Sequence, residues 1–368
     1  MLKAYFGSSP LFKMTFVMKK TWLTLSSTLL MMATSSAWAD RTIVDQIGRE
    51  VTIPDQVNRV VVLQHQTLDL LMQLDAKDKI VGVLSSWKKH LGAEVIRLDP
   101  ALPSLPMPGD LTQVNVESLL KLNPQVVFVT NYAPQAMIDQ ISNAGIPVVA
   151  ISLRADKAGQ ANKMNADMAN EDQVYNQGLA QGIRLIGDVV NRQKQAEQLI
   201  KTTFADRAEV AKRLDEIKPA ERVRVYMANP NLTTYGSGKY TGLMMQHAGA
   251  VNVAAASIKG YQQVSIENVM QWNPQVIFVQ SRYPNVVKEI NTDPRWQSID
   301  AVVHHRVYLM PEYAKAWGYA TPEALAIGEM WMAKKLYPAN FKDVDMTQLA
   351  NRYYEQFYHV PYTQAVTQ

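Results

Sequence analysis

The sequence predicts an α/β protein in which one long, rigid α-helix joins two doubly wound lobes. Strand-like and helix-like segments alternate along both halves of the chain, one helix-and-strand segment occurs twice, and a stretch between the halves keeps helical spacing. Alternating strands and helices are typical of mainly parallel sheets covered by helices. A chain of 368 residues is long enough for two such lobes.

Residues 1–39 are expected to be a targeting segment. Residues 18–20 (MKK) form a short basic start, residues 21–36 are mostly apolar or small, and residues 37–39 (AWA) form a cleavage site. We therefore expect translation to begin at Met18 or Met14, and the exported mature chain to start at Asp40. A buried N-terminal helix is the alternative.

Charge and cysteine content restrict the partners and the compartment. Residues 40–368 contain 33 basic and 33 acidic residues, so the mature chain lacks the electrostatic footprint of a nucleic-acid-binding protein. The sequence has no cysteine, which excludes a disulfide framework and the lipidated cysteine of a bacterial lipoprotein. We expect a soluble periplasmic protein that binds no nucleic acid.

Each half of the mature chain contains the segments of one lobe. In the N-terminal lobe, residues 40–191, strands are expected at 59–63, 80–84, 126–129 and 148–151, and helices at 67–74 and 136–143. In the C-terminal lobe, residues 218–368, strands are expected at 223–228, 276–279 and 306–310, and helices at 242–248 and 286–290. Short runs of β-branched residues are typical of strands buried on both faces.

Residues 192–217 are expected to form the connecting helix. Seven apolar positions from Ala196 to Leu214 follow helical spacing, and Asn191 is the expected N-cap. At 1.5 Å per residue, the helix is roughly 39 Å long, which makes it a stiff connector.

The repeated segment occurs once in each lobe. Residues 113–129 (QVNVESLLKLNPQVVFV) and 263–279 (QVSIENVMQWNPQVIFV) are identical at nine of seventeen positions. Each copy predicts a helix that stops before proline and a buried strand that follows. Glu117 and Glu267 fall in the first helical turn, where the macrodipole favours an anion. The simplest interpretation is that both are favourable first-turn residues.

Several segments of the mature chain resemble one protein family. They are DQIGREVTIP (45–54) followed by RVV (59–61), LQHQTLDLL (63–71), VTNYAP (129–134), NPNLTTYGSGKYTGLMM (229–245) and MPEYAKAWGYATPEALAIGEMW (310–331). With the two lobes, the rigid helix and the export signal, they resemble the helical-backbone class of periplasmic binding proteins, which serve ABC importers of ferric siderophores, cobalamin and heme. Within this class they are most similar to the branch that includes molybdate- and tungstate-binding proteins.

The resemblance implies two Rossmann-like lobes that hold a ligand in a shallow cleft and close by a small rocking motion. It implies no catalysis and no cofactor. The implied ligand is a molybdate or tungstate oxyanion, or a metal chelate of the ferric-siderophore type. The implied partners of this monomer are an ABC permease at the inner membrane and an outer-membrane receptor upstream. In this family each lobe offers a glutamate to permease arginines, so Glu117 and Glu267 become the expected docking residues.

Candidate ligand contacts follow the expected strand ends, because ligands of doubly wound lobes bind beyond the carboxyl ends of the strands. Polar loops at helix starts and nearby arginines suit an oxyanion or an anionic chelate. The expected ligand-binding residues are His65, Gln66, Trp87, Tyr132, Arg154, Asn229, Tyr235, Arg282 and Tyr283.

Structural alternatives exist for several of these residues. His65 is then a core histidine with hydrogen-bond partners inside the protein, Tyr132 packs at a strand end, and Arg154 forms an ion pair with Asp156. Asn229 in that case only builds a turn before a proline.

Two aromatic residues and one rival function complete the expectations. Trp317 and Tyr319 are expected to pack within their lobe rather than to hold the ligand. The rival function is an exported two-lobe α/β enzyme with its site in the cleft. The sequence has no complete P-loop, dinucleotide-binding or H-E-x-x-H motif to support it.

Overall fold

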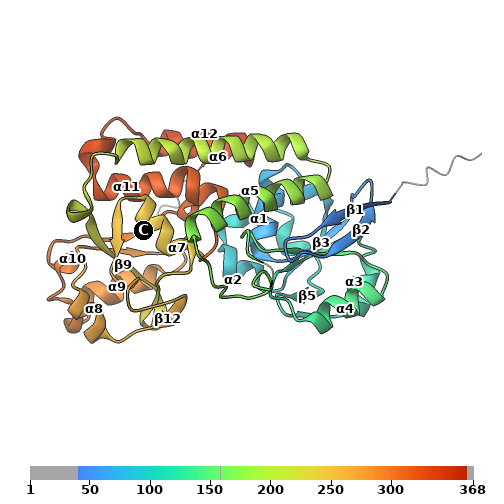
Figure 1. Ribbon diagram of the computed structural model, residues 1–368, viewed down its shortest axis with the longest axis horizontal. Helices are drawn as coiled ribbons and strands as arrows, with labels where there is room; N and C mark the ends of the chain where they lie inside the picture. The colour runs from blue at the N-terminus through green and yellow to red at the C-terminus, as the bar shows by residue number, and fades with distance from the viewer. Residues whose placement is uncertain (1–39, 158, 363–368) are drawn as a thin grey trace, which may run out of the picture. The chain divides into compact units, whose positions relative to one another are not determined.

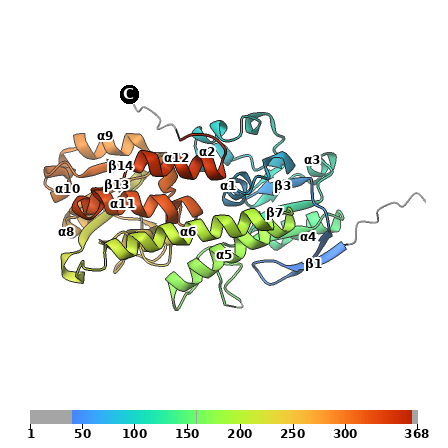
Figure 2. The same cartoon turned by 90° about the horizontal axis from the view of Figure 1, so that it is seen from above.

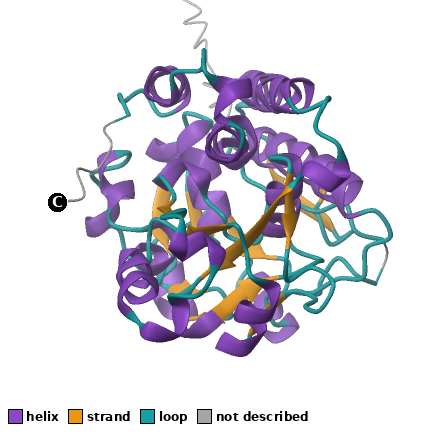
Figure 3. Ribbon diagram, turned by 90° about the vertical axis from the view of Figure 1, so that its left-hand side faces the viewer, coloured by secondary structure: helices purple, strands orange, loops and turns teal. Residues whose placement is uncertain are grey.

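The computed structural model describes residues 40–157 and 159–362, so the expected targeting segment lies outside the described residues. Two α/β lobes are joined through helix α6 (Gln193–Arg213), as predicted (Figure 1). Helices lie on both sides of the strands (Figure 3), the arrangement of a doubly wound fold. No helix in these two ranges is both long and apolar enough to cross a membrane.

The N-terminal lobe is built on a parallel sheet with the strand order β4-β3-β7-β8. Its strands are β3 (Val60–Leu63), β4 (Ile80–Val83), β7 (Val126–Thr130) and β8 (Val148–Ile151). Antiparallel pairs are formed by β1 (Asp40–Val44) with β2 (Glu50–Pro54), and by β5 (Gly109–Asp110) with β6 (Gln113–Val114). The helices are α1 (His65–Gln73), α2 (Trp87–Leu91), α3 (Val116–Lys121), α4 (Gln135–Asn143) and α5 (Glu171–Val189).

The C-terminal lobe repeats this topology with the strand order β11-β9-β13-β14. Its parallel strands are β9 (Val223–Ala228), β11 (Ala250–Asn252), β13 (Val276–Val279) and β14 (Val307–Leu309). Strands β10 (Thr233–Tyr235) and β12 (Tyr261–Gln263) form an antiparallel pair. The helices are α7 (Tyr240–His247), α8 (Ile266–Trp272), α9 (Pro284–Thr292), α10 (Asp300–Val303), α11 (Glu329–Leu336) and α12 (Met346–Phe357).

Four of the parallel strands are fully buried, and their sequences are almost continuously apolar. Every residue of β3, β7, β8 and β13 is buried. Helices cover both faces of a parallel sheet, so a strand at its centre has no side exposed to water. This is why these strands could be predicted from runs of valine, isoleucine and phenylalanine without any alternation.

The repeated segment docks β7 against β3 in the N-terminal lobe and β13 against β9 in the C-terminal lobe. The backbone N–H of Gln125 donates to the carbonyl of Arg59 at 2.8 Å, and that of Gln275 donates to the carbonyl of Arg224 at 2.9 Å. Each glutamine side chain also accepts from the backbone N–H of the same arginine, at 3.0 Å in both lobes. The repetition therefore has a structural cause in addition to any role of its glutamates.

Helix α6 starts differently from the prediction. Asn191 does not cap it, because its backbone is left-handed, with φ 56°. Its side chain instead accepts from the N–H of Val57 at 3.3 Å and donates to the carbonyl of Asp55 at 3.0 Å. Arg192 is the N-cap residue. Asn191 thus anchors the start of α6 to the segment before β3.

The end of α6 also precedes the predicted residue 217. The helix stops at Arg213, and Lys218, before Pro219, has the extended backbone that proline imposes on its predecessor. Along its 21 residues α6 contacts α5 and α11. Figure 2 shows α5 and α6 side by side. The connector is therefore packed against elements of both lobes.

Helix α5, strand β11 and helices α10–α12 were not predicted from the sequence. Helix α5 contains Gly178, Gly182 and Gly187, which lower helix propensity. A Cβ on Gly178 would come within 2.1 Å of the Arg154 backbone. Close packing against the end of β8 thus requires a residue that weakens the local helical signal.

We expect the asparagines of the repeat to be required for their left-handed backbone. Asn123 has φ 45° and Asn273 has φ 41°. Alanine tolerates this conformation poorly, so Asn123→Ala should lower the free energy of unfolding by about 1 kcal/mol. The free energy of unfolding of Asn123→Gly should stay within about 0.5 kcal/mol of that of the unmodified protein. Chemical denaturation of residues 40–368 measures both, and an alanine variant as stable as the original would contradict this role.

Candidate functional site

The candidate site lies between the loops that follow the carboxyl ends of the two parallel sheets. His65 follows β3 and His90 lies in α2 after β4, whereas Arg282 follows β13 and Trp317 follows β14. The ring centroids of His65 and Trp317 are 5.9 Å apart. Arg282 Nη1 donates to the backbone carbonyl of His90 at 3.3 Å. Residues from both lobes therefore meet where a doubly wound fold places its ligand.

His65 presents a buried ring nitrogen without a protein partner. Its ring stacks on His90 with centroids 4.3 Å apart, and the residue is only 7% exposed. Nδ1 has no hydrogen-bond partner among the described residues. Burial lowers the pKa of His65 well below its usual range, and His90 and Arg282 lower it further. A neutral imidazole thus has one ring nitrogen available for a ligand.

Arg282 is held in the cleft by neutral groups. Its Nε donates to Gln280 Oε1 at 2.9 Å, and Gln280 Nε2 donates to Asn229 Oδ1 at 2.5 Å. The guanidinium lies 5.0 Å from the ring centroid of Tyr283. Asn229 and Tyr283, both predicted as ligand contacts, are therefore placed where they orient Arg282. No carboxylate neutralises Arg282 among the ion pairs of the described residues.

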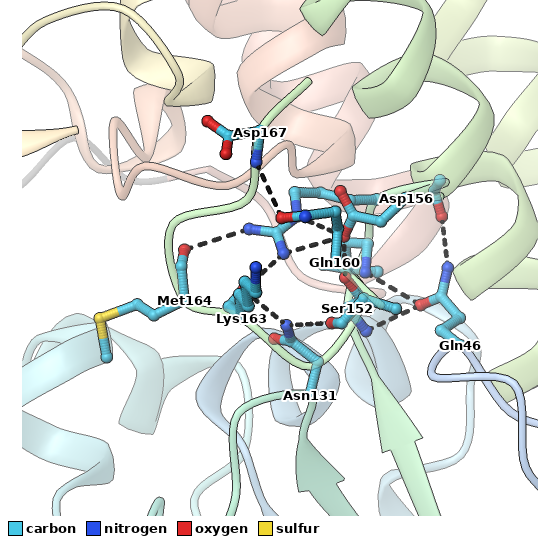
Figure 4. A network of polar contacts seen from close by, with 12 residues as sticks. Gln46, Asn131, Ser152, Asp156, Gln160, Lys163, Met164 and Asp167 are labelled. Atoms are coloured by element: carbon cyan, nitrogen blue, oxygen red, sulfur yellow. Dashed lines mark hydrogen bonds and ion pairs between the residues drawn. The ribbon is translucent and has the colours of Figure 1, made fainter. Parts of the chain in front are cut away.

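Arg154 occupies a different environment. It is 1% exposed, and its Nη2 lies 2.8 Å from Asp156 Oδ2. It also donates to the carbonyls of Lys163 at 2.7 Å and Met164 at 3.1 Å, within the network of Figure 4. The ion pair with Asp156, the structural alternative for Arg154, is present. Its guanidinium thus holds the segment around residues 163–164.

This segment also bonds to the C-terminal lobe. Lys239 Nζ donates to the carbonyl of Met164 at 2.8 Å, and burial, with Arg154 close by, lowers the pKa of Lys239 to about 8. The ring of Tyr319 lies 6.0 Å from the Arg154 guanidinium and 5.6 Å from Lys239 Nζ. The Tyr319 hydroxyl is buried without a partner in the described part of the chain. Tyr319 thus packs between Arg154 and Lys239, and whether it also contacts a ligand stays a prediction.

The other predicted contacts are less closely tied to this site. Trp87 is 5% exposed and belongs to the hydrophobic core, and Gln66 is buried in the first turn of α1. Tyr132 is partly buried, which raises the pKa of its hydroxyl. Tyr235 is 6% exposed, with its ring 4.6 Å from that of Tyr261, and burial raises its pKa to about 12.

A narrow cavity opens beside these residues. It has a volume of about 20 Å³. Its lining includes Leu91, Gly92 and Glu94 from the N-terminal lobe and Ser281, Arg282, Lys315 and Trp317 from the C-terminal lobe. A cavity of this size holds about one water molecule. A ligand larger than one water molecule therefore requires a small separation of the lobes at this cavity.

His90, Trp317 and Tyr319 were not among the predicted contacts. The strand-end rule selected the loop that carries Trp317, but its ring was assigned to packing. His90 follows the expected contact Trp87 by one turn of α2, so helical spacing was the available signal. The local sequence does not show whether a buried tyrosine hydroxyl, such as that of Tyr319, has a hydrogen-bond partner.

The two glutamates of the repeat lie in the first turns of α3 and α8, as predicted. The N-cap side chains of Asn115 and Ser265 accept from backbone N–H groups at 2.8 and 3.2 Å. The Glu117 side chain is 80% exposed and pairs with Lys121 at 2.8 Å. Hydrogen bonds from its own backbone and from Ser265 lower the pKa of Glu267. Each lobe thus offers one exposed carboxylate in an equivalent position.

Comparisons with known proteins agree with this architecture. The molybdate-binding protein MolA of Haemophilus influenzae is 58% identical over 338 residues, which cover 92% of this chain and 96% of MolA. A solved structure of MolA bound to molybdate has a TM-score of 0.86 and covers 89% of this chain and 100% of the MolA chain. It is described as the cognate periplasmic binding protein of an ABC transporter.

More distant proteins share the fold. A periplasmic solute-binding protein of Veillonella parvula is 24% identical, with a TM-score of 0.71, and the match covers 88% of this chain and 94% of that one. An iron-uptake system-binding protein of Bacillus subtilis is 23% identical over 216 residues, 55% of this chain and 59% of the relative. The family described as periplasmic binding protein matches residues 60–314. This match covers more than half of the chain, which therefore belongs to the periplasmic binding protein family.

Proposed function

We propose that this protein captures molybdate, or the chemically equivalent tungstate, in the cleft between its lobes and delivers it to an ABC permease. The observation that carries the proposal is the unpartnered ring nitrogen of the neutral His65 at the sheet ends, beside His90, whose carbonyl Arg282 binds. Lys315 on the same cavity wall is paired with Asp69, whereas Arg282 has no carboxylate partner among the described residues, and its guanidinium suits a small oxyanion because a buried anion requires hydrogen bonds. Similarity to MolA supports the same ligand class.

The narrow cleft supports an oxyanion over a siderophore-type chelate. The rings of His65 and Trp317 are in edge contact, with centroids 5.9 Å apart, and the two adjoining cavities have volumes of only about 20 and 230 Å³. A tetrahedral oxyanion requires a small opening of the lobes, whereas a chelate several times larger requires a wide one. Helix α6 packs against both lobes and opposes wide opening.

Delivery is proposed to use Glu117 and Glu267 as docking residues for permease arginines. Each carboxylate is exposed, and the two occupy equivalent first turns. Carboxylate and guanidinium match as a bidentate pair. We further propose that the protein acts as a monomer and carries out no chemistry on its ligand.

We expect molybdate and tungstate to stabilise the mature protein. At 100 times the dissociation constant, a ligand should raise the free energy of unfolding by about 2.7 kcal/mol. Thermal unfolding of protein isolated from the periplasm, whose intact mass should correspond to a start at Asp40, is the measurement. Ferric siderophores, heme and cobalamin are the comparison ligands. Stabilisation by one of these and not by the oxyanions would contradict the proposed ligand class.

The two arginines should respond differently to truncation. Arg282→Ala should weaken molybdate binding by about 1.5–3 kcal/mol, the contribution of a charged hydrogen bond. Arg154→Ala should leave the affinity of the folded protein unchanged but lower its stability by about 3–5 kcal/mol, because Asp156 remains buried without its partner. Calorimetry and chemical denaturation separate the two effects. The opposite pattern would place Arg154 in the ligand site.

The double variant Glu117→Ala/Glu267→Ala should keep its fold and its ligand affinity but lose uptake. Exposed first-turn glutamates contribute only about 0.3–1 kcal/mol each to stability. Each lost carboxylate, however, leaves permease arginines unpaired in the interface. The measurement is molybdate uptake by cells that contain only this variant, with binding measured in parallel.

A matched control for docking is Glu289→Ala/Glu355→Ala, which removes two exposed glutamates outside the repeat. This control should transport normally. Normal uptake by the Glu117/Glu267 variant would refute the docking role, whereas combined loss of binding and uptake would assign the two glutamates to the ligand site.

A further inference from the structure

Helix α1 has a polar face although every one of its nine residues is buried. His65, Asp69 and Gln73 are spaced four residues apart, so their side chains lie along one face of the helix. Each contacts the C-terminal half of the chain. His65 faces Trp317, Asp69 bonds to Lys315 at 2.6 Å, and Gln73 accepts from the hydroxyl of Tyr353 at 2.7 Å. We call this row of contacts the seam.

The middle layer of the seam contains two carboxylates and one ammonium group. Lys315 Nζ donates to Asp69 Oδ1 at 2.6 Å, to the Tyr358 hydroxyl at 3.0 Å, and to Glu323. The Tyr358 hydroxyl also bonds to Asp69 at 2.9 Å. The side chains of Lys315, Asp69 and Glu323 are 6%, 1% and 0% exposed. Burial and the Glu323 carboxylate raise the pKa of Asp69 to about 7.

This charged layer joins the two segments that form the walls of the ligand site. Asp69 lies one helical turn after His65, on the same face of α1. Lys315 begins the turn that leads to Trp317, whose N–H donates to the Lys315 carbonyl at 2.7 Å. The backbone of Lys315 is left-handed, with φ 39°, a conformation that a lysine adopts only when its surroundings hold it there.

A stabilising role alone does not explain such a cluster. Replacing a buried ion pair by apolar residues of similar volume is often neutral or stabilising, so its net contribution to stability is small. Its geometry, however, allows only one relative position of the groups that it joins. The cluster bonds α1 of one lobe to residues 315 and 323 of the other, beside the ligand cleft, and therefore restricts how the lobes rock.

We propose that Asp69, Lys315 and Glu323 form an interlobe latch that holds His65 opposite Trp317 before the ligand arrives. Asp69 and Lys315 are then positioning residues for ligand binding. The proposal relies on the ligand site proposed above but not on the identity of the ligand. The latch preorganises the two walls, and a protein without it spends part of its time in arrangements that do not bind.

The test compares the latch with a neutral replacement of similar shape, Asp69→Asn/Lys315→Met/Glu323→Gln. The chain has no cysteine, so spin labels at Ser142→Cys in α4 and Asn291→Cys in α9, both exposed positions, report the interlobe distance. In the ligand-free protein, pulsed electron paramagnetic resonance should show a broader distance distribution for the neutral variant. If the binding arrangement is one-tenth populated, molybdate should bind about tenfold more weakly. Saturating molybdate should narrow the distribution again.

A one-lobe control separates this effect from lower stability. Val127→Ala removes buried volume within β7 and should leave both the distance distribution and the molybdate affinity unchanged. If the triple variant does not fold, Asp69→Asn is measured in its place and should broaden the distribution in the same direction.

Three results would overturn the latch. They are an unchanged distance distribution in the variants, weaker binding without a change in that distribution, and an equal change in the Val127→Ala control. If the unmodified protein fails to bind molybdate, the proposed ligand is wrong. The ligand-free distance distributions still decide whether the latch exists.

Discussion

The two sheets share one cleft because a packed helix fixes how the lobes are joined. Helix α6 contacts α5 and α11 along its 21 residues, so the connection has no flexible linker. The loops after β3 and β4 therefore meet the loops after β13 and β14. His65 and His90 belong to one lobe, and Arg282 and Trp317 belong to the other. The site exists only when both lobes are in place.

Electrostatics explain why Arg282 and Arg154 have different roles although both follow a buried parallel strand. Arg154 is neutralised by the Asp156 carboxylate and also donates to the backbone carbonyls of Lys163 and Met164. Arg282 is oriented by the neutral amide of Gln280, so its charge is retained for a ligand. The neutral state of His65 adds an unpartnered ring nitrogen without a further buried cation, whose desolvation would be costly.

The sequence predicted most of the fold because its strands are buried on both faces and its halves repeat. Continuous apolar runs located β3, β7, β8 and β13 within one residue of their observed bounds. Helix α5 was missed because its glycines allow close packing, for example of Gly178 against Arg154 and of Gly187 against Ala196, a tertiary requirement that opposes local propensity. Asn191 was assigned to a cap, whereas its contacts with Val57 and Asp55 require the left-handed backbone.

The candidate site was predictable at the level of loops but not of individual side chains. The rule for strand ends identified His65 and Arg282 and also the loop of Trp317. It could not separate Arg282 from Arg154, because the partners of Arg154 at residues 163 and 164 come from the fold of the intervening segment. Whether the Tyr319 hydroxyl has a partner is likewise a property of tertiary packing.

The polar face of α1 indicates contacts outside the helix that the rule for strand ends does not consider. A histidine, an aspartate and a glutamine at intervals of four residues on a buried helix each require a partner. The helix supplies one of these partners itself, because Gln73 Nε2 donates to Asp69 Oδ2 at 3.2 Å, but the others lie outside it. In a protein of two lobes, the partners come from the other lobe. The same face that carries His65 therefore also bonds to the segment of Lys315 and Trp317, which forms the second wall of the candidate site.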